Sequence, residues 1–169
     1  MRVVLIMTIT ADGFISRDAG DDSGWTEKYD KLFFDQTTRG IGTVIIGANS
    51  FKLLPEPFEG RRMIVMTSNP NLERFVPNVL EFSSQEPQEL LKSLDDEGVS
   101  EVAIIGGSQI NSSFLQESLI DEVYLIVAPL LFGRGLSLAA EYDLDMKLQL
   151  IAEEKLSDTV VLLHYEVVK

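Results

Sequence analysis

The chain has 169 residues, of which 45% are hydrophobic, and no linker rich in proline, glycine or serine divides it, so we expect a single domain over residues 1–169. Its 14 basic and 27 acidic residues give a formal net charge of −13, which disfavours nucleic acids and anionic membranes as partners. The absence of cysteine and the single histidine exclude a disulfide framework, a thiolate nucleophile and a multi-histidine metal site, so no metal is expected.

The N-terminal apolar run is too short for a signal peptide and lacks a cleavage-site pattern, and no run reaches membrane-spanning length. We therefore expect a cytoplasmic protein.

Eight segments have the composition of β-strands. Val3–Ile9 is almost continuously apolar, which is typical of a strand buried on both faces in the middle of a sheet. The last two segments are separated by Ser157-Asp158 and should pair as an antiparallel hairpin. The predicted strands are Val3–Ile9, Thr43–Gly47, Arg62–Thr67, Asn78–Phe82, the run from Glu101 to Ile105, Asp121–Pro129, Lys147–Leu156 and Thr159–Val168.

Four segments with helical spacing alternate with these strands. They are Glu27–Arg39 with Thr26 as N-cap, Asn49–Leu54, the segment from Pro87 to Gly98, and Gln109–Glu117. The alternation predicts an α/β fold with a mostly parallel sheet. The loop Thr10–Gly24 is rich in turn residues and long enough to cover a ligand.

Glycine and hydroxyl residues follow four of the predicted strands, in the segments Thr8–Thr10, Gly47–Ser50, Thr67–Asn69 and Gly106–Ser108. Ligands of an open α/β sheet bind outside the carboxyl ends of its strands. Each segment alone is compatible with ordinary turn and capping chemistry. Together they favour a phosphate-bearing cofactor, such as a dinucleotide, and the adjacent glycines Gly106 and Gly107 would let the backbone approach it closely.

These motifs resemble those of the dihydrofolate reductase-like reductases, in the same order and over nearly the whole chain. Each is weak alone, but six in sequence form a specific signal. They are Thr10-Ala-Asp12-Gly13, the set Trp25, Asp30 and Phe34, Gly47-Ala-Asn-Ser50-Phe51, Gly60-Arg61, Thr67-Ser68 and Ile105-Gly106-Gly107. The resemblance implies a three-layer fold with a mostly parallel eight-stranded sheet, a C-terminal antiparallel hairpin and about four flanking helices.

Two branches of this family compete. Leu119–Gly135 and Thr10-Ala-Asp-Gly13 resemble the reductase domain of the bifunctional deaminase-reductase of riboflavin synthesis, whereas Trp25, Asp30 and Arg61 are equally typical of folate reductases. We favour the riboflavin branch, which implies hydride transfer to a ribosylaminopyrimidine phosphate. A dihydrofolate or pteridine reductase remains the alternative, as does a non-catalytic nucleotide-binding module on the same fold. The chain has no room for a deaminase domain.

The resemblance also implies a set of site residues. Asp30 is the first candidate for catalysis and Asp12 the second. The implied cofactor-binding residues are Ala11, Gly47, Asn49, Ser50, Thr67, Ser68, Ile105, Gly106, Gly107, Ser108 and Gln109. The implied substrate-binding residues are Trp25, Asp30, Phe34, Phe51, Leu54 and Arg61.

The expected cofactor is NADPH, with NADH as the alternative. Family members that use NADPH commonly carry basic residues where this chain has Ala48 and Ser108-Gln109. Ser68, Asn49, Lys52 or Arg74 would have to bind the 2′-phosphate instead.

Other expectations concern single features. The resemblance implies a cis peptide bond between Gly106 and Gly107, and a homodimer formed near the apolar strand Val123–Pro129. Arg61 could bind a substrate anion or lie in a solvated turn. His164 is expected to be structural, and Trp25 to be either a core anchor or a cavity residue.

Overall fold

The computed structural model describes residues 1–21, 24–26, 28–69, 79–140 and 143–169. Within these residues the chain forms ten strands and four helices, and none of these helices is long and apolar enough to cross a membrane. In chain order the elements are β1 (Arg2–Thr10), β2 (Phe14–Ser16), α1 (Lys28–Ile41), β3 (Thr43–Gly47), α2 (Ala48–Phe51), β4 (Arg62–Met66), β5 (Leu80–Ser83), α3 (Pro87–Asp96), β6 (Glu101–Ile104), α4 (Ser108–Gln116), β7 (Glu122–Ala128), β8 (Leu136–Ser137), β9 (Leu148–Lys155) and β10 (Val161–Val167).

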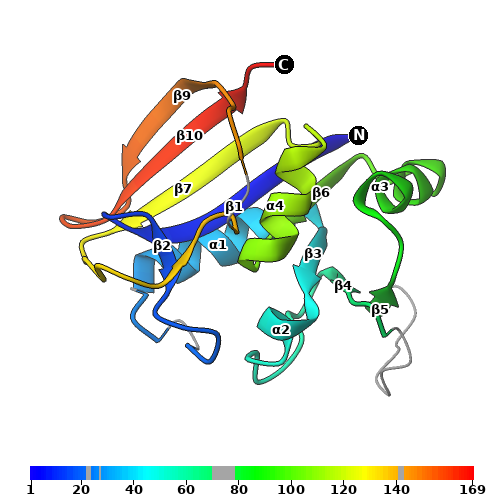
Figure 1. Ribbon diagram of the computed structural model, residues 1–169, viewed down its shortest axis with the longest axis horizontal. Coiled ribbons are helices and arrows are strands. Elements are labelled where there is room, and N and C mark those ends of the chain that lie inside the picture. The colour runs from blue at the N-terminus through cyan, green and yellow to red at the C-terminus, as the bar shows by residue number, and fades with distance from the viewer. Residues whose placement is uncertain (22–23, 27, 70–78, 141–142) are drawn as a thin grey trace.

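Eight strands form one sheet in the order β5-β4-β3-β6-β1-β7-β10-β9 (Figure 1). Neighbouring strands from β5 to β7 are parallel, whereas β10 runs antiparallel to both β7 and β9. The strand β1 lies between β6 and β7, and its residues Val4 and Leu5 are fully buried. The predicted central position of the first strand, the eight-stranded sheet and the C-terminal hairpin are confirmed.

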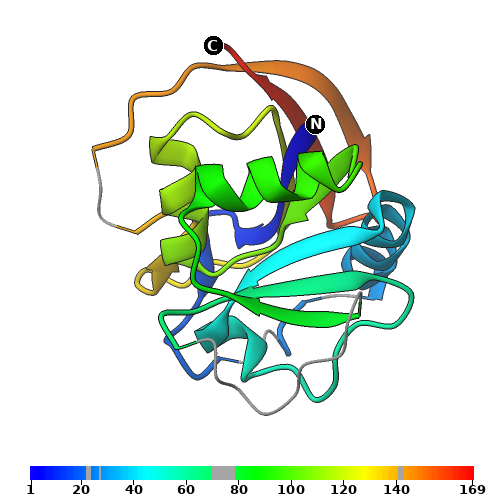
Figure 2. The same ribbon diagram turned by 90° about the vertical axis from the view of Figure 1, so that its right-hand side faces the viewer.

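Alternate side chains of the central strand face two different layers. Val3 and Leu5 of β1 pack in a core that contains residues of α3 and α4, whereas Val4 and Ile6 pack in a second core beside Phe34 of α1. Successive side chains of a strand point to opposite faces, so a strand covered on both faces requires a continuous apolar run. Figure 2 shows α3 and α4 on one side of the sheet and α1 on the other. The three-layer α/β arrangement is confirmed.

The predicted elements differ from the observed ones at several places. The segment from Thr10 to Gly24 is not entirely a loop, because β2 lies within it and pairs with β8 in a separate two-stranded sheet. The helix expected over Asn49–Leu54 ends at Phe51. The expected helix start at Glu27 and strand start at Asn78 lie outside the described residues.

A charged cluster spans β1, β7 and β10. Arg2 donates hydrogen bonds through Nε and Nη2 to the two carboxylate oxygens of Glu122, at 2.7 and 2.6 Å. The same carboxylate lies 2.6 Å from Nε2 of His164, whose ring stacks on Tyr124 with centroids 4.0 Å apart. Hydrogen bonding from Arg2, followed by that from His164, holds the pKa of Glu122 below its ordinary value. These contacts support a structural role for His164.

Candidate active site

Two adjoining cavities lie at the edge of the sheet where the parallel strands end. The first cavity has a volume of about 500 Å³ and the second cavity a volume of about 960 Å³. Both are lined by Ile15, Ser50, Leu53 and Gly107, so they share a wall. This is the edge at which the glycine and hydroxyl residues after the strands were expected to bind a ligand.

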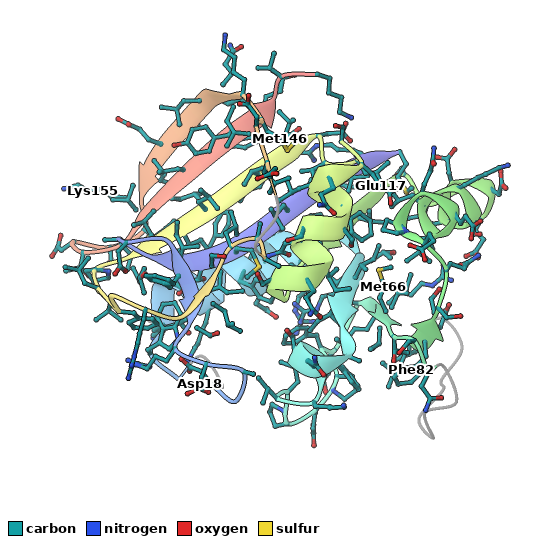
Figure 3. The ribbon with its side chains drawn as sticks, viewed as in Figure 1. Asp18, Met66, Phe82, Glu117, Met146 and Lys155 are labelled. Carbon is teal, nitrogen blue, oxygen red and sulfur yellow. The ribbon has the colours of Figure 1, made fainter. Side chains whose placement is uncertain are left out.

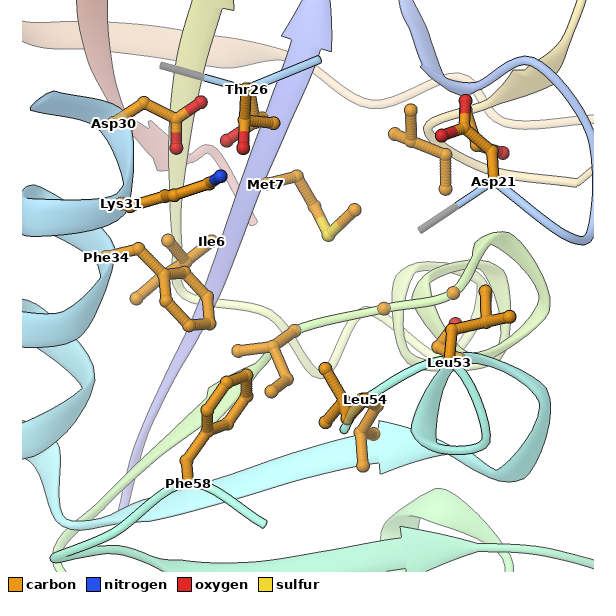
Figure 4. Close-up of a pocket in the computed structure, with 18 of the residues that line it drawn as sticks. Ile6, Met7, Asp21, Thr26, Asp30, Lys31, Phe34, Leu53, Leu54 and Phe58 are labelled. Carbon is orange, nitrogen blue, oxygen red and sulfur yellow. The ribbon is translucent and has the colours of Figure 1, made fainter. Parts of the chain in front are cut away.

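The first cavity has mostly apolar walls. Figure 4 shows Asp30, Lys31 and Phe34 projecting into it from α1, with Leu54 and Phe58 below them in this view. The predicted substrate residues that line it are Trp25, Asp30, Phe34, Leu54 and Arg61. A concave apolar site with a few polar groups is the usual form of a small-molecule site.

Phe51 is the exception among the predicted substrate residues. Its ring packs edge-on against Phe82, with centroids 5.9 Å apart, in the core beneath α2 and β5. The aromatic position of the glycine-hydroxyl-aromatic motif therefore anchors α2 to the sheet, while Ser50 before it reaches both cavities.

Asp30 supplies a buried carboxyl group to the first cavity. Only 3% of the residue is exposed, and it lies in the first turn of α1. A helix N-terminus favours a negative charge nearby. Trp25 and Phe34 line the same cavity, so aromatic side chains share its walls with the carboxyl group. A carboxylate placed in this way can accept paired hydrogen bonds from the N–H and amino groups of a heterocycle.

Trp25 belongs both to the packed structure and to the cavity wall. Its ring meets that of Phe132 edge-on, with centroids 5.2 Å apart, and it also lines the first cavity. Its buried Nε1 has no hydrogen-bond partner within the described part of the chain. The two interpretations of Trp25 from the sequence are therefore compatible.

Arg61 is a buried residue that lines the first cavity. Its guanidinium donates to Asp35 Oδ1 at 2.7 Å, to Thr38 Oγ1 at 2.6 Å and to the Glu59 carbonyl at 3.2 Å. It also lies 4.9 Å from the centroid of the Phe58 ring. Only 5% of Arg61 is exposed, so the solvated turn considered from the sequence is wrong. The contacts of its nitrogens tie α1 to the segment before β4.

The second cavity is lined by most of the predicted cofactor residues. They are Gly47, Asn49, Ser50, Thr67, Ser68, Gly107, Ser108 and Gln109. Asp18, which lies between β2 and α1, and Met66, at the end of β4, line it as well (Figure 3). Ile105 and Gly106 line the first cavity instead, and Ala11 donates its backbone N–H to the carbonyl of Leu130 at 2.9 Å.

The glycines between β6 and α4 form the boundary between the cavities. The peptide bond between Gly106 and Gly107 is cis, as expected, and Gly106 has a φ of 103°. A β-carbon on Gly107 would lie 2.7 Å from Ser50 Oγ, so only glycine leaves this surface open. The first turn of α4, beginning at Ser108, faces the second cavity with backbone N–H groups that suit a phosphate. The chain therefore offers a cradle that fits a dinucleotide pyrophosphate.

Asp12, the second candidate for catalysis, links the loop after β1 to the loop after β7 through hydrogen bonds. Its carboxylate accepts hydrogen bonds from the Thr10 hydroxyl at 2.5 Å, from the N–H of Gly133 at 2.7 Å and from that of Phe132 at 3.1 Å. Hydrogen bonding from Thr10, and then from the two N–H groups, holds the pKa of Asp12 below its ordinary value. These contacts fix the loop that carries Phe132 against Trp25.

Several lining residues were missed from the sequence. The second cavity is also lined by the segment from Ser83, the last residue of β5, to Pro87, the first residue of α3. The serines at the end of β5 carried the same signal as the hydroxyl residues after β4. Gly135–Ser137 reaches the second cavity from beyond β7. A β-carbon on Gly135 would collide with the carbonyl oxygen of Ser16, a contact that no local pattern reveals. Lys31 was overlooked beside Asp30.

Comparison with known proteins identifies the family. Residues 2–162 match the RibD C-terminal domain family, so the chain belongs to this family, whose fold is the dihydrofolate reductase-like reductase fold. The resemblance noted from the motifs is confirmed in its riboflavin-type branch. The fold is that of a riboflavin-pathway reductase domain.

Individual proteins resemble this chain in sequence or in fold. The chain is 24% identical over 172 residues to the uncharacterized protein YwjB of Bacillus subtilis, covering 97% of each. It superposes on RibD of Acinetobacter baumannii with a TM-score of 0.82 at 18% identity, covering 99% of this chain and 58% of that one. A diaminohydroxyphosphoribosylaminopyrimidine deaminase/5-amino-6-(5-phosphoribosylamino)uracil reductase from Thermotoga maritima gives a TM-score of 0.79 at 23% identity, covering 99% and 56%. The chain thus spans little more than half of these two longer proteins.

Proposed function

We propose that the protein is an NADPH-dependent reductase of the riboflavin-pathway type, which transfers hydride to a ribosylaminopyrimidine phosphate. The main support for this proposal is that the predicted substrate residues and the predicted cofactor residues line mainly different cavities. The predicted substrate residues gather mainly in the first cavity and the predicted cofactor residues mainly in the second. The shared wall at Gly107 and Ser50 is where the two ligands would meet.

The proposed reaction needs a hydride donor, an electron-poor carbon and a proton. Reduced nicotinamide supplies the hydride, and the carbon of a C=N or C=O group accepts it while the neighbouring nitrogen or oxygen gains a proton. Asp30 binds the amino and N–H groups of the pyrimidine and orients the ring. Its carboxyl group also promotes the protonation. The apolar walls formed by Ile6, Phe34 and Leu54 keep water away from the reacting atoms.

NADPH rather than NADH is the proposed reductant, with Lys52 and Ser68 as the groups that bind the 2′-phosphate. Both line the second cavity, as does Asn49. Arg74, another candidate from the sequence, lies outside the described residues. NADH is the alternative, because Asp18 and Glu86 line the same cavity and would repel the additional phosphate. Michaelis constants for the two cofactors, measured with the native protein and with Lys52→Gln, distinguish them.

The test of the function is a substrate panel that follows the loss of reduced-nicotinamide absorbance. We expect oxidation of NADPH with the ribosylaminopyrimidine phosphate and little with dihydrofolate. Preferential turnover of dihydrofolate would replace the proposal by the folate or pteridine alternative, which Trp25 and Asp30 also suit. Cofactor binding without turnover of any substrate in the panel would favour a nucleotide-binding module.

We also propose that the protein forms a homodimer through the side of the sheet that carries the C-terminal hairpin. The strand β7 has β1 and β10 as neighbours, so its own edge is not available for pairing. The outer strand is β9, on which Leu148, Leu150 and Ile151 are exposed. Exposed apolar residues on an edge strand favour association. Sedimentation at micromolar concentration tests the proposal, and a monomer under those conditions contradicts it.

A further inference from the structure

Lys31 stands out among the charged groups of the first cavity. The described residues that line this cavity carry positive charge at Lys31 and Arg61 and negative charge at Asp21, Asp30 and Asp35. The nitrogens of Arg61 are already engaged with protein oxygens. The part of the chain that the structure describes provides no hydrogen bond or ion pair for Lys31. Lys31 is therefore the cation of this cavity that is available to a ligand.

The position of Lys31 suits a ligand that Asp30 also binds. The two residues are adjacent on α1, and Figure 4 shows the carboxylate of Asp30 and the ammonium of Lys31 both directed into the cavity. Asp30 is buried, whereas Lys31 is an exposed residue whose ammonium keeps its hydration until a ligand arrives. A molecule held by both must carry hydrogen-bond donors on one part and an anion on another.

The negative charge around Lys31 makes its ammonium important for binding a ligand that carries an anion. The whole chain has a net charge of −13, and Asp21 and Asp30 line the same cavity, so an anionic ligand meets repulsion unless a cation compensates locally. Asp35 is already neutralised by Arg39 and Arg61. A lysine ammonium is a compact point charge with three N–H donors, and it binds phosphate groups as a point charge.

We propose that Lys31 determines substrate specificity by binding a phosphate monoester on the substrate while Asp30 holds the heterocycle. This inference rests on the proposed function for the heterocycle, but the phosphate is recognised by Lys31 whatever ring is attached. A neutral nucleoside would satisfy Asp30 alone and would bind more weakly.

The test measures binding through the fluorescence of Trp25, the single tryptophan, which lines the same cavity. One ligand pair is the ribosylaminopyrimidine 5′-phosphate and its dephosphorylated nucleoside, and a second pair is ribose 5-phosphate and ribose. Each pair is titrated into the native protein and three variants. Lys31→Gln removes the charge, Lys31→Arg keeps it, and Lys28→Gln removes a charge from an exposed residue on the same helix.

For the native protein we expect the phosphorylated member of each pair to bind about ten- to a hundredfold more tightly, the range of a charge-assisted hydrogen bond. The difference should shrink as ionic strength rises, vanish in Lys31→Gln, and persist in Lys28→Gln and largely in Lys31→Arg. A phosphate preference that survives Lys31→Gln, or a native protein without any preference, would overturn the inference.

The two ligand pairs separate this inference from the proposed function. If the pyrimidine is not reduced but ribose 5-phosphate still binds more tightly than ribose in a Lys31-dependent manner, the proposed function fails and the phosphate site stands. If the pyrimidine is reduced while Lys31→Gln keeps its full preference for the phosphorylated ligands, the phosphate site fails and the proposed function stands.

Discussion

Replacement of Arg61 by methionine tests whether this residue holds the structure together or serves the ligand. The variant keeps an apolar side chain but removes the guanidinium, whose carbon lies 4.9 Å from the centroid of the Phe58 ring. With the guanidinium go the donors to Asp35, Thr38 and the Glu59 carbonyl. Because Thr38 Oγ1 still donates to the Phe34 carbonyl at 2.7 Å, the change does not leave this hydroxyl isolated. The expected loss is therefore that of the hydrogen bonds themselves.

The magnitude follows from the burial of each partner. The bond to fully buried Thr38 should contribute about 1.5 kcal/mol, and the longer bond to the Glu59 carbonyl about 0.5–1 kcal/mol. The side chain of Asp35 is 45% exposed and also binds Arg39, so its bond to Arg61 counts for only about 0.5–1 kcal/mol. The total is about 3 kcal/mol, which corresponds to a fall in Tm of roughly 6–12 °C for a chain of this length.

Urea unfolding followed by circular dichroism measures the change in the free energy of unfolding. Arg39→Met is the matched control, because this exposed arginine contacts the same Asp35 and should lose no more than about 1 kcal/mol. A free energy of unfolding for Arg61→Met within about 1 kcal/mol of the native value, together with a large loss of substrate affinity, would refute the structural role. Such a result would mean that the guanidinium binds the substrate.

Three further changes test the site and the charged cluster. Asp30→Asn should lower kcat by about 10² or more while the Kd for the cofactor stays nearly unchanged, and unaltered steady-state kinetics would remove Asp30 from the mechanism. Gly107→Ala places a β-carbon 2.7 Å from Ser50 Oγ and should weaken cofactor binding in fluorescence titrations; full affinity would mean that the cofactor lies elsewhere. The pKa of Glu122 is depressed from an ordinary value of 4.5, so its contribution to stability is present above about pH 4.5 and is lost as the pH falls through the folded-state pKa. Glu122→Gln should therefore flatten the acid decline in unfolding free energy, and an unchanged slope would contradict this.

The central layers could be predicted from the sequence because their signals are local. The apolar run Val3–Ile9 requires cover on both faces, and the glycines Gly106 and Gly107 mark the junction between β6 and α4. By contrast, β2 and β8 are too short for a periodic pattern, and they pair across more than a hundred residues of chain. Their pairing depends on close packing at Gly135, which is a tertiary contact.

The side chains of the site were predictable to different degrees. The resemblance to the family implied a substrate site with Trp25, Asp30 and Phe34, and all three line the first cavity. Asp30 and Phe34 are four positions apart in α1 and so lie on one face of that helix. Asp12 shares a loop motif with the family, but its hydrogen bonds to the N–H groups of Phe132 and Gly133 come from a distant segment and were not foreseeable. The role of Arg61 likewise depends on Asp35 and Thr38, which are brought to it only by the fold.

Transfer of deuterium from NADPH labelled at the reactive nicotinamide carbon tests the central claim most directly. The claim is that a cofactor in the second cavity and a pyrimidine in the first cavity meet at the wall that the cavities share. Mass spectrometry should show a single deuterium on a carbon of the product, which is the reduced form of the ribosylaminopyrimidine phosphate, and Asp30→Asn should slow its appearance. Absence of labelled product, with both ligands bound to the folded protein, would contradict the account.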